Sequence, residues 1–100
     1  MQKILLNKSP KRIGLYYVYI VECKNGYYYT GYTSNLENRI KLHEKGHGAK
    51  YLKGKGPIKL VYAKEYRYYK SALNGERRLK KLTRTQKKKL IKTYQNESHM

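Results

Sequence analysis

The stretch YYVYIVECKNGYYYTGYT, residues 16–33, decides the fold. It consists of two runs of aromatic and β-branched residues, and both residue types favour β-strands. Between the runs lie Lys24, Asn25 and Gly26, and Asn-Gly is a strong short-range signal for a hairpin turn. We therefore predict that the two runs pair as an antiparallel hairpin.

The length of this turn determines which side chains share a face of the sheet. If Asn25 and Gly26 alone formed a two-residue turn, Tyr19 and Tyr29 would point to opposite faces. A three-residue loop with Gly26 in the left-handed conformation shifts the pairing by one residue. The last paired residue of the first strand is then Cys23, and Tyr19 and Tyr29 lie on the same face. We predict the three-residue loop.

The charge of the chain indicates its partner. One hundred residues suffice for one domain, and 24 Lys and Arg against six acidic residues give a formal charge of +18. Such a field attracts polyanions, with nucleic acid as the first candidate and an anionic membrane surface as the second. No apolar run has the length of a transmembrane span and no signal peptide is visible, so we expect no membrane partner. The single Cys23 fits a reducing compartment, and we expect a cytoplasmic protein.

The acidic residues restrict the chemistry. The chain has no Asp, so its side-chain carboxylates are Glu22, Glu37, Glu44, Glu65, Glu76 and Glu97. A two-metal phosphodiesterase needs several clustered carboxylates, which this chain can hardly supply. Phe and Trp are also absent and all 13 aromatic residues are Tyr, so several tyrosines must fill the core.

After the hairpin, the sequence predicts a helix, a strand and two further helices. Residues 34–37, Ser-Asn-Leu-Glu, have the S-x-x-E pattern of a capping box and open a helix that ends at Gly46. A third strand over residues 58–63 is mostly apolar and is predicted to be central in the sheet. A helix over about 70–82 follows, and a second capping box at residues 83–86 opens the last helix.

The first helix places two polar residues beside its apolar stripe. At about 100° per residue, Arg39 and His43 fall in the same arc as Leu36 and Ile40. A guanidinium beside a core is costly unless an anion pairs with it, so Arg39 and His43 are candidate site residues. The alternatives are an Arg39 that reaches the edge of the core and a half-buried His43 with satisfied hydrogen bonds.

The second helix carries the acidic candidate, Glu76, on its inward arc. The small and apolar residues of this arc are Ala72, Gly75, Leu79 and Leu82. Gly75 weakens a helix by about 1 kcal/mol, which favours a close backbone approach at this position. The alternative role of Glu76 is an i,i+4 ion pair with Lys80. Arg77 lies on the outward face and is a candidate contact for nucleic acid.

Further basic residues lie in loops and on the last helix. Residues 46–56 combine glycines with Lys50, Lys53 and Lys55, which suits phosphate contacts and is also typical of solvated loops. The run Lys87-Lys88-Lys89 is most simply a solvated face and secondarily a phosphate contact. The last helix turns Leu90, Ile91 and Tyr94 inward, and residues 1–15 are predicted to form a loosely ordered basic arm.

Five stretches of the chain resemble, in order, the motifs of the GIY-YIG nuclease superfamily, in particular its small single-domain members. They are Tyr17-Val18-Tyr19 for GIY, Tyr29-Thr30-Gly31 for YIG, the helix with Arg39 and His43, the segment GAKYLKGKGPIKLVY, and the segment ALNGERRLKKL. A two-tyrosine signature alone would be weak, whereas five motifs in order are specific. The resemblance covers about residues 16–92.

The resemblance implies a mixed α/β (α+β) domain, which we place at residues 16–94 with a tail at 95–100. A three-stranded antiparallel sheet would be flanked by helices in the order β-β-α-β-α-α. It also implies an endonuclease that hydrolyses phosphodiester bonds of nucleic acid, DNA rather than RNA, with one divalent cation, Mg²⁺ or Mn²⁺. The family includes DNA repair enzymes that use a second domain for targeting. Because this chain has none, the alternative is a weak or inactive nucleic-acid-binding protein of the same fold.

The resemblance also assigns roles to five residues. Glu76 would hold the metal ion, and Arg39 would stabilise the charge of the transition state. Tyr29 or Tyr19 would take a proton from the attacking water, directly or through the other. We expect nearby positive charge to lower the pKa of these phenols. His43 would orient the water or a tyrosine, or share the proton transfer.

Overall fold

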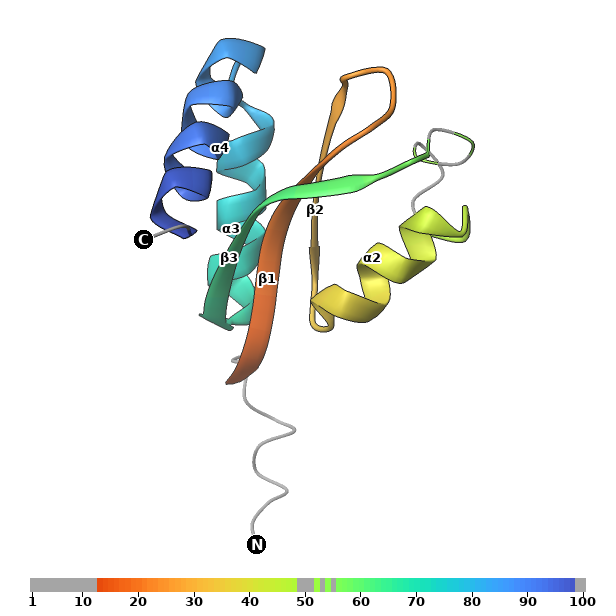
Figure 1. Cartoon of the computed structure of the whole chain (residues 1–100). Coiled ribbons are helices and arrows are strands. Elements are labelled where there is room, and N and C mark those ends of the chain that lie inside the picture. The colour runs from red at the N-terminus through yellow and green to blue at the C-terminus, as the bar shows by residue number, and fades with distance from the viewer. Residues whose placement is uncertain (1–12, 49–51, 53, 55, 99–100) are drawn as a thin grey trace, which may run out of the picture.

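The strands and helices follow one another in the predicted order. The computed structural model describes residues 13–48, 52, 54 and 56–98, and contains a three-stranded sheet and three helices there (Figure 1). The elements are β1 (Ile13–Glu22), β2 (Tyr28–Thr33), α2 (Leu36–Glu44), β3 (Lys59–Tyr68), α3 (Tyr69–Lys80) and α4 (Arg84–Ser98). The predicted α/β fold with an antiparallel sheet is confirmed.

The hairpin has the three-residue loop. The backbone N–H of Cys23 donates to the Tyr27 carbonyl and that of Gly26 to the Cys23 carbonyl, both at 2.8 Å. Gly26 has φ +86°, a left-handed conformation that favours glycine. β1 and β2 therefore pair in the register that places Tyr19 and Tyr29 on the same face, as predicted.

The third strand lies at an edge of the sheet. The strand order is β2-β1-β3 with both pairs antiparallel, so the prediction of a central third strand is wrong. β3 is also longer than predicted, and Val61 is its one buried residue. Val61 is buried near its start, whereas Lys64, Glu65, Arg67 and Tyr68 are exposed, a pattern that suits an edge strand. The apolar run over residues 58–63 therefore indicates burial on one face of the sheet. It does not require a neighbouring strand on each side.

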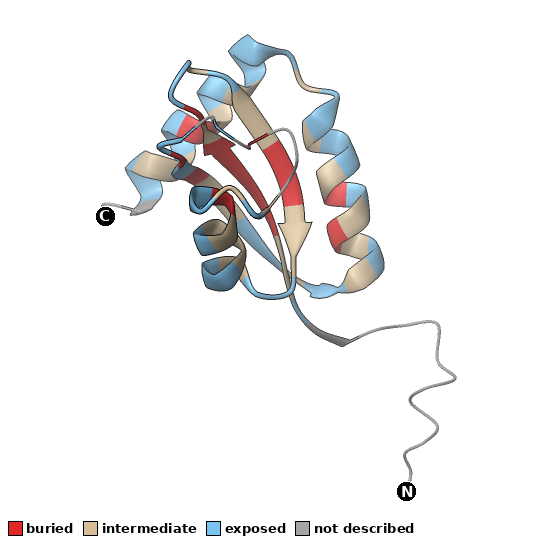
Figure 2. Ribbon diagram, turned by 90° about the vertical axis from the view of Figure 1, so that its right-hand side faces the viewer, coloured by how far each residue is buried: buried red, intermediate tan, exposed pale blue. Residues whose placement is uncertain are grey.

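Helices cover both faces of the sheet. α3 and α4 lie on one face and α2 lies on the other (Figure 1). The buried cluster on the α2 side contains Tyr19 and Leu52, and the cluster on the α4 side contains Ile20, Val61 and Ile91. Buried residues follow the middle of the strands (Figure 2). The prediction that tyrosine serves as core is confirmed by Tyr19, which is 0% exposed.

The helix ends show one shifted cap and one predicted cap. Asn35, not Ser34, is the N-cap of α2, and its side chain accepts from the N–H of Asn38 at 3.1 Å. Ser and Asn are both favourable N-cap residues, so the sequence alone does not determine which of the two caps the helix. The geometry of the preceding turn decides it. Before α4, Thr83 and Gln86 form the predicted reciprocal box, with distances of 2.9 and 3.2 Å.

Gly75 on α3 lies against a tyrosine of β3. A Cβ at Gly75 would meet the Tyr66 hydroxyl, and it would lie 2.8 Å from Tyr66 Cζ. The predicted close approach therefore occurs, and the neighbour is a phenol ring resting on the helix backbone. It brings α3 close to the sheet at the position next to Glu76.

Some predicted features fall outside the described residues. These are residues 1–12 of the basic arm and the three loop lysines Lys50, Lys53 and Lys55. None of the helices in the described ranges has both the length and the apolar character needed to cross a membrane.

Candidate active site

Three ring side chains from three elements meet on the α2 side of the sheet. The ring centroid of Tyr19 on β1 is 6.5 Å from that of Tyr29 on β2 and 5.8 Å from that of His43 on α2. The rings of Tyr29 and His43 are 5.7 Å apart. The Tyr19 hydroxyl and His43 Nε2 form a hydrogen bond of 2.7 Å. His43 is 1% exposed, so it is fully buried, not half-buried, and its partner is a candidate catalytic tyrosine.

Gly31 makes room for the Tyr19 phenol. A Cβ at Gly31 would lie 2.6 Å from the Tyr19 hydroxyl oxygen and 3.1 Å from Cε2 of Tyr29. The phenol thus occupies the space that any other side chain would fill. Because Gly31 belongs to the edge strand β2, the Tyr19 hydroxyl extends from the central strand to the rim of the sheet.

Arg39 brings positive charge to the phenols. It hydrogen-bonds Tyr19, and its charge acts on both Tyr19 and His43. Arg39 Nε is buried and has no hydrogen-bond acceptor among the described residues. A buried donor without an acceptor costs about 1–3 kcal/mol, so this N–H favours an incoming anion.

The two hydrogen-bonded rings are both neutral at pH 7. Burial raises the pKa of Tyr19 to about 12, although its hydrogen bond with Arg39 and the charge of Arg39 lower it. Arg39 thus lowers the pKa of Tyr19 as expected, but the loss of hydration outweighs one guanidinium and the net shift is upward. Burial, and next the charge of Arg39, lower the pKa of His43 below its usual value. The Tyr19–His43 pair consequently holds two neutral groups beside a cation.

Glu76 reaches this group from α3. Its side chain is 14% exposed, and its charge is one of the causes that raise the pKa of Tyr19. Its Oε2 lies 3.2 Å from Lys80 Nζ, so the alternative i,i+4 ion pair also forms. No group of three or more His, Cys, Asp or Glu that could hold a metal occurs in the described part of the chain. One inward-facing carboxylate nevertheless fits Mg²⁺, which keeps several of its waters and needs few protein oxygens.

The structure brings three predicted site residues into ring contact, and the charges of two more act on Tyr19. The first three are Tyr19, Tyr29 and His43, and the other two are Arg39 and Glu76. Arg77 is exposed on α3. The sequence reasoning missed Gly48, where a Cβ would lie 2.7 Å from Cε1 of His43, so that this backbone closes over the imidazole. A glycine between two basic loop segments gave no signal for that contact.

Comparison with known proteins agrees with this arrangement. Residues 15–90 match the family model described as the GIY-YIG catalytic domain. The chain is 45% identical over 82 residues to the UPF0213 protein OB0043 of Oceanobacillus iheyensis, a match that covers 82% of this chain and 95% of that protein. It is 53% identical over 75 residues to the UPF0213 protein CPE1444 of Clostridium perfringens, with 75% and 81% covered.

Two solution NMR structures are similar to this fold. The UPF0213 protein BH0048 from Bacillus halodurans is 43% identical with a TM-score of 0.53, over 79% of this chain and 84% of that one. The protein EF2693 from E. faecalis is 32% identical with a TM-score of 0.56, over 84% and 92%. None of these names states an activity.

Proposed function

The chain belongs to the GIY-YIG family, and from this premise we propose that it is an endonuclease hydrolysing phosphodiester bonds of nucleic acid, DNA in preference to RNA. The observation that carries the proposal is the meeting of two phenols, a buried imidazole, a guanidinium and a carboxylate. The unpaired Nε–H of Arg39 supports an anionic ligand at this place. The net charge of +18 supports a polyanionic substrate.

Tyr29 is the phenol best suited to take the proton of the attacking water. Tyr19 has a pKa of about 12 and a hydrogen bond to His43, so it keeps its own proton at neutral pH. The Tyr19–His43 pair would then position Tyr29, whose ring lies 6.5 and 5.7 Å from the two partners. Arg39 would stabilise the charge that develops on the phosphate in the transition state.

Glu76 is the residue that would hold a divalent cation. When bound, Mg²⁺ or Mn²⁺ supplies a Lewis acid for a phosphate oxygen and for the departing oxygen. Since one carboxylate provides the protein ligand, binding should be weak and sensitive to Lys80, which pairs with the same Oε2. Mn²⁺ should broaden NMR signals around Glu76 in the wild-type protein and leave them sharp in Glu76→Gln.

Removing the carboxylate tests the proposal directly. We expect Glu76→Gln to lower metal-dependent nicking of labelled DNA by about 100-fold or more, because the metal ligand is lost. Binding of the same DNA should persist, since a negative charge is removed. Glu44→Gln on the outward side of α2 is the matched control and should cut like the wild type.

A nucleic-acid-binding protein without activity is the second candidate. The observation that favours it is the Lys80–Glu76 ion pair at 3.2 Å, which gives the carboxylate a purely structural use. In that case no cleavage would be seen on duplex, branched or single-stranded DNA or RNA with Mg²⁺ or Mn²⁺. Glu76→Gln would then bind DNA as the wild type does and change only stability, by a few tenths of a kcal/mol.

A further inference from the structure

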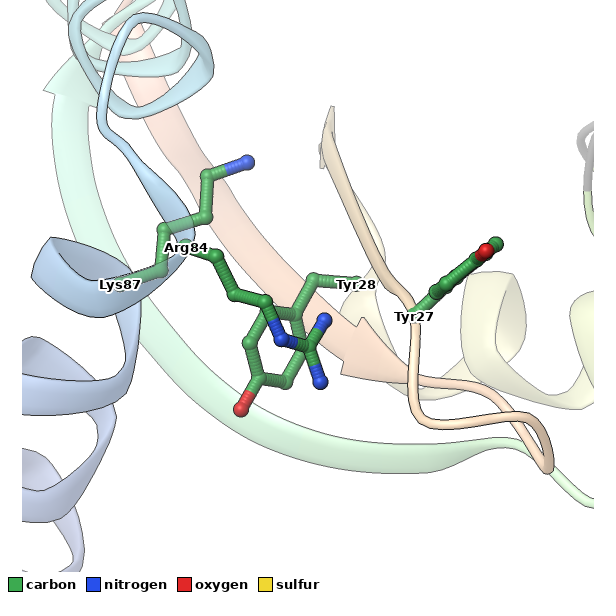
Figure 3. A pocket seen from close by; sticks show the side chains of 4 residues that line it. All are labelled: Tyr27, Tyr28, Arg84 and Lys87. Carbon is green, nitrogen blue, oxygen red and sulfur yellow. The ribbon is translucent and has the colours of Figure 1, made fainter.

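A basic hollow lies where the hairpin loop meets the start of α4. Its volume is about 220 Å³, and its lining residues are Tyr27, Tyr28, Arg84 and Lys87 (Figure 3). Tyr27 and Tyr28 come from the β2 side of the hairpin, while Arg84 and Lys87 occupy the first turn of α4. None of the five candidate catalytic residues lines it.

Arg84 is held in a fixed position in this hollow. Its Nη2 donates to the Gly26 carbonyl at 2.8 Å, and its guanidinium lies 4.9 Å from the centroid of the Tyr28 ring. The two contacts anchor the guanidinium over an aromatic face (Figure 3). A guanidinium carries five N–H donors, so the Gly26 contact leaves donors for a second acceptor. An oriented arginine of this kind suits a phosphate.

The positive charge of the hollow is not balanced by carboxylates. Within the described ranges the ion pairs are Lys41–Glu37 and Lys80–Glu76, and neither Arg84 nor Lys87 takes part in one. Lys87 is half-buried, and burial together with the charge of Lys80 lowers its pKa. Cations held together without an anion attract one from solution.

Tyr27 supplies an exposed aromatic surface at the same hairpin, and its ring points away from Arg84, on the other side of β2 (Figure 3). It is 56% exposed, so the ring is accessible to a ligand. It lies two residues before Tyr29, on the same side of the hairpin. Two residues of a strand span about 7 Å, which is one to two nucleotides along a nucleic-acid strand.

We propose that this hollow binds a phosphate of the nucleic acid on Arg84 and Lys87, one or two nucleotides from the phosphate that is cleaved, and that an unpaired base of the same strand stacks on Tyr27 across β2. The inference rests on the proposed nuclease function for the placement of the cleaved phosphate at Tyr29. The binding itself depends only on the contacts described above.

The base contact is tested with two strands that share a backbone. Binding of labelled oligothymidylate, and of an abasic strand of equal length, is measured by fluorescence anisotropy in EDTA. We expect Tyr27→Ala to weaken binding of oligothymidylate about tenfold, because base–tyrosine stacking is lost. On the abasic strand the change should stay within about twofold. Tyr68→Ala, which removes another exposed tyrosine, is the control and should change neither Kd by more than about twofold.

The phosphate contact is tested by the salt dependence of the same binding. Lys87→Gln should reduce the slope of log K against log salt by about 0.7, the value for one phosphate contact to a single strand. Lys89→Gln removes an equal charge from the same helix outside the hollow and should change the slope less. Equal effects of Tyr27→Ala on both strands, or equal slopes for the two lysine variants, would overturn the proposal.

These measurements separate the two proposals. A protein that never cuts nucleic acid but loses base-dependent affinity on Tyr27→Ala has the nucleotide site and lacks the nuclease function. A protein that cuts nucleic acid, and whose Tyr27→Ala and Tyr68→Ala variants bind both strands alike, has the nuclease function and lacks this site.

Discussion

The candidate active site depends on the absence of a side chain at Gly31. The Tyr19 hydroxyl oxygen lies 2.6 Å from the position of a Cβ at Gly31, and both residues belong to paired strands that leave little freedom to shift. Gly31→Ala should therefore displace the Tyr19 phenol and break its bond to His43. We expect a loss of about 1–3 kcal/mol in the free energy of unfolding and a larger proportional loss of cleavage.

Urea denaturation and a cleavage assay on the same preparation measure both effects. Gly56→Ala is the control, since a Cβ there would meet no atom within 4 Å. If Gly31→Ala is as stable and as active as Gly56→Ala, the site does not depend on the position of the Tyr19 phenol.

The buried His43 makes stability depend on pH. Its pKa in the folded protein is lowered by burial and by Arg39, so below about pH 6.5 the unfolded chain binds more protons than the folded one. Stability contributed by neutral His43 is therefore present above the unfolded pKa and is lost as the pH falls. We expect the free energy of unfolding to drop between about pH 7 and pH 5, by up to ~1.4 kcal/mol per pH unit.

Chemical denaturation across this range measures the slope. His43→Gln should flatten it, whereas His47→Gln, which changes an exposed histidine, should leave it in place. If both variants show the same dependence of unfolding free energy on pH, titratable groups other than His43 cause it.

At the scale of elements, α3 depends on the contact between Gly75 and Tyr66. An alanine normally stabilises a helix interior by about 1 kcal/mol over glycine. Here the new Cβ would lie 2.8 Å from Tyr66 Cζ, so Gly75→Ala should destabilise the protein and move Glu76 away from Tyr19. In a Tyr66→Leu background the contact is gone, and the same substitution should be neutral or stabilising.

The free energies of unfolding of the four proteins in this cycle give the coupling between the two positions. A stabilising Gly75→Ala in the wild-type background would mean that the ring of Tyr66 moves aside at little cost.

At the scale of the whole molecule, the net charge of +18 should dominate affinity. Each phosphate contact releases counterions, so a protein with six to ten such contacts loses about 10³–10⁵ in affinity between 50 and 200 mM salt. We expect this steep dependence for duplex and single-stranded DNA in EDTA, measured by fluorescence anisotropy. A flat salt profile would contradict binding through phosphates.

Local signals predicted much of this molecule. The hairpin loop and the inward faces of the helices follow from turn chemistry and from periodicity, so the positions of Tyr29, His43 and Glu76 could be inferred. The edge position of β3 could not, because strand order depends on contacts between distant segments. The raised pKa of Tyr19 also escaped prediction, since it is set by complete burial in the folded state.

β2 lies at an edge of the sheet, beside the candidate active site. This strand has a neighbour on one side only, and Gly31, beneath the Tyr19 hydroxyl, belongs to it. The proposed endonuclease hydrolyses internal phosphodiester bonds, so no free end of the nucleic acid is needed at this edge. A covalently closed circle should therefore be cut as readily as a linear molecule of the same sequence, and supercoiled plasmid would relax to the nicked form before any shortening of linear fragments is seen.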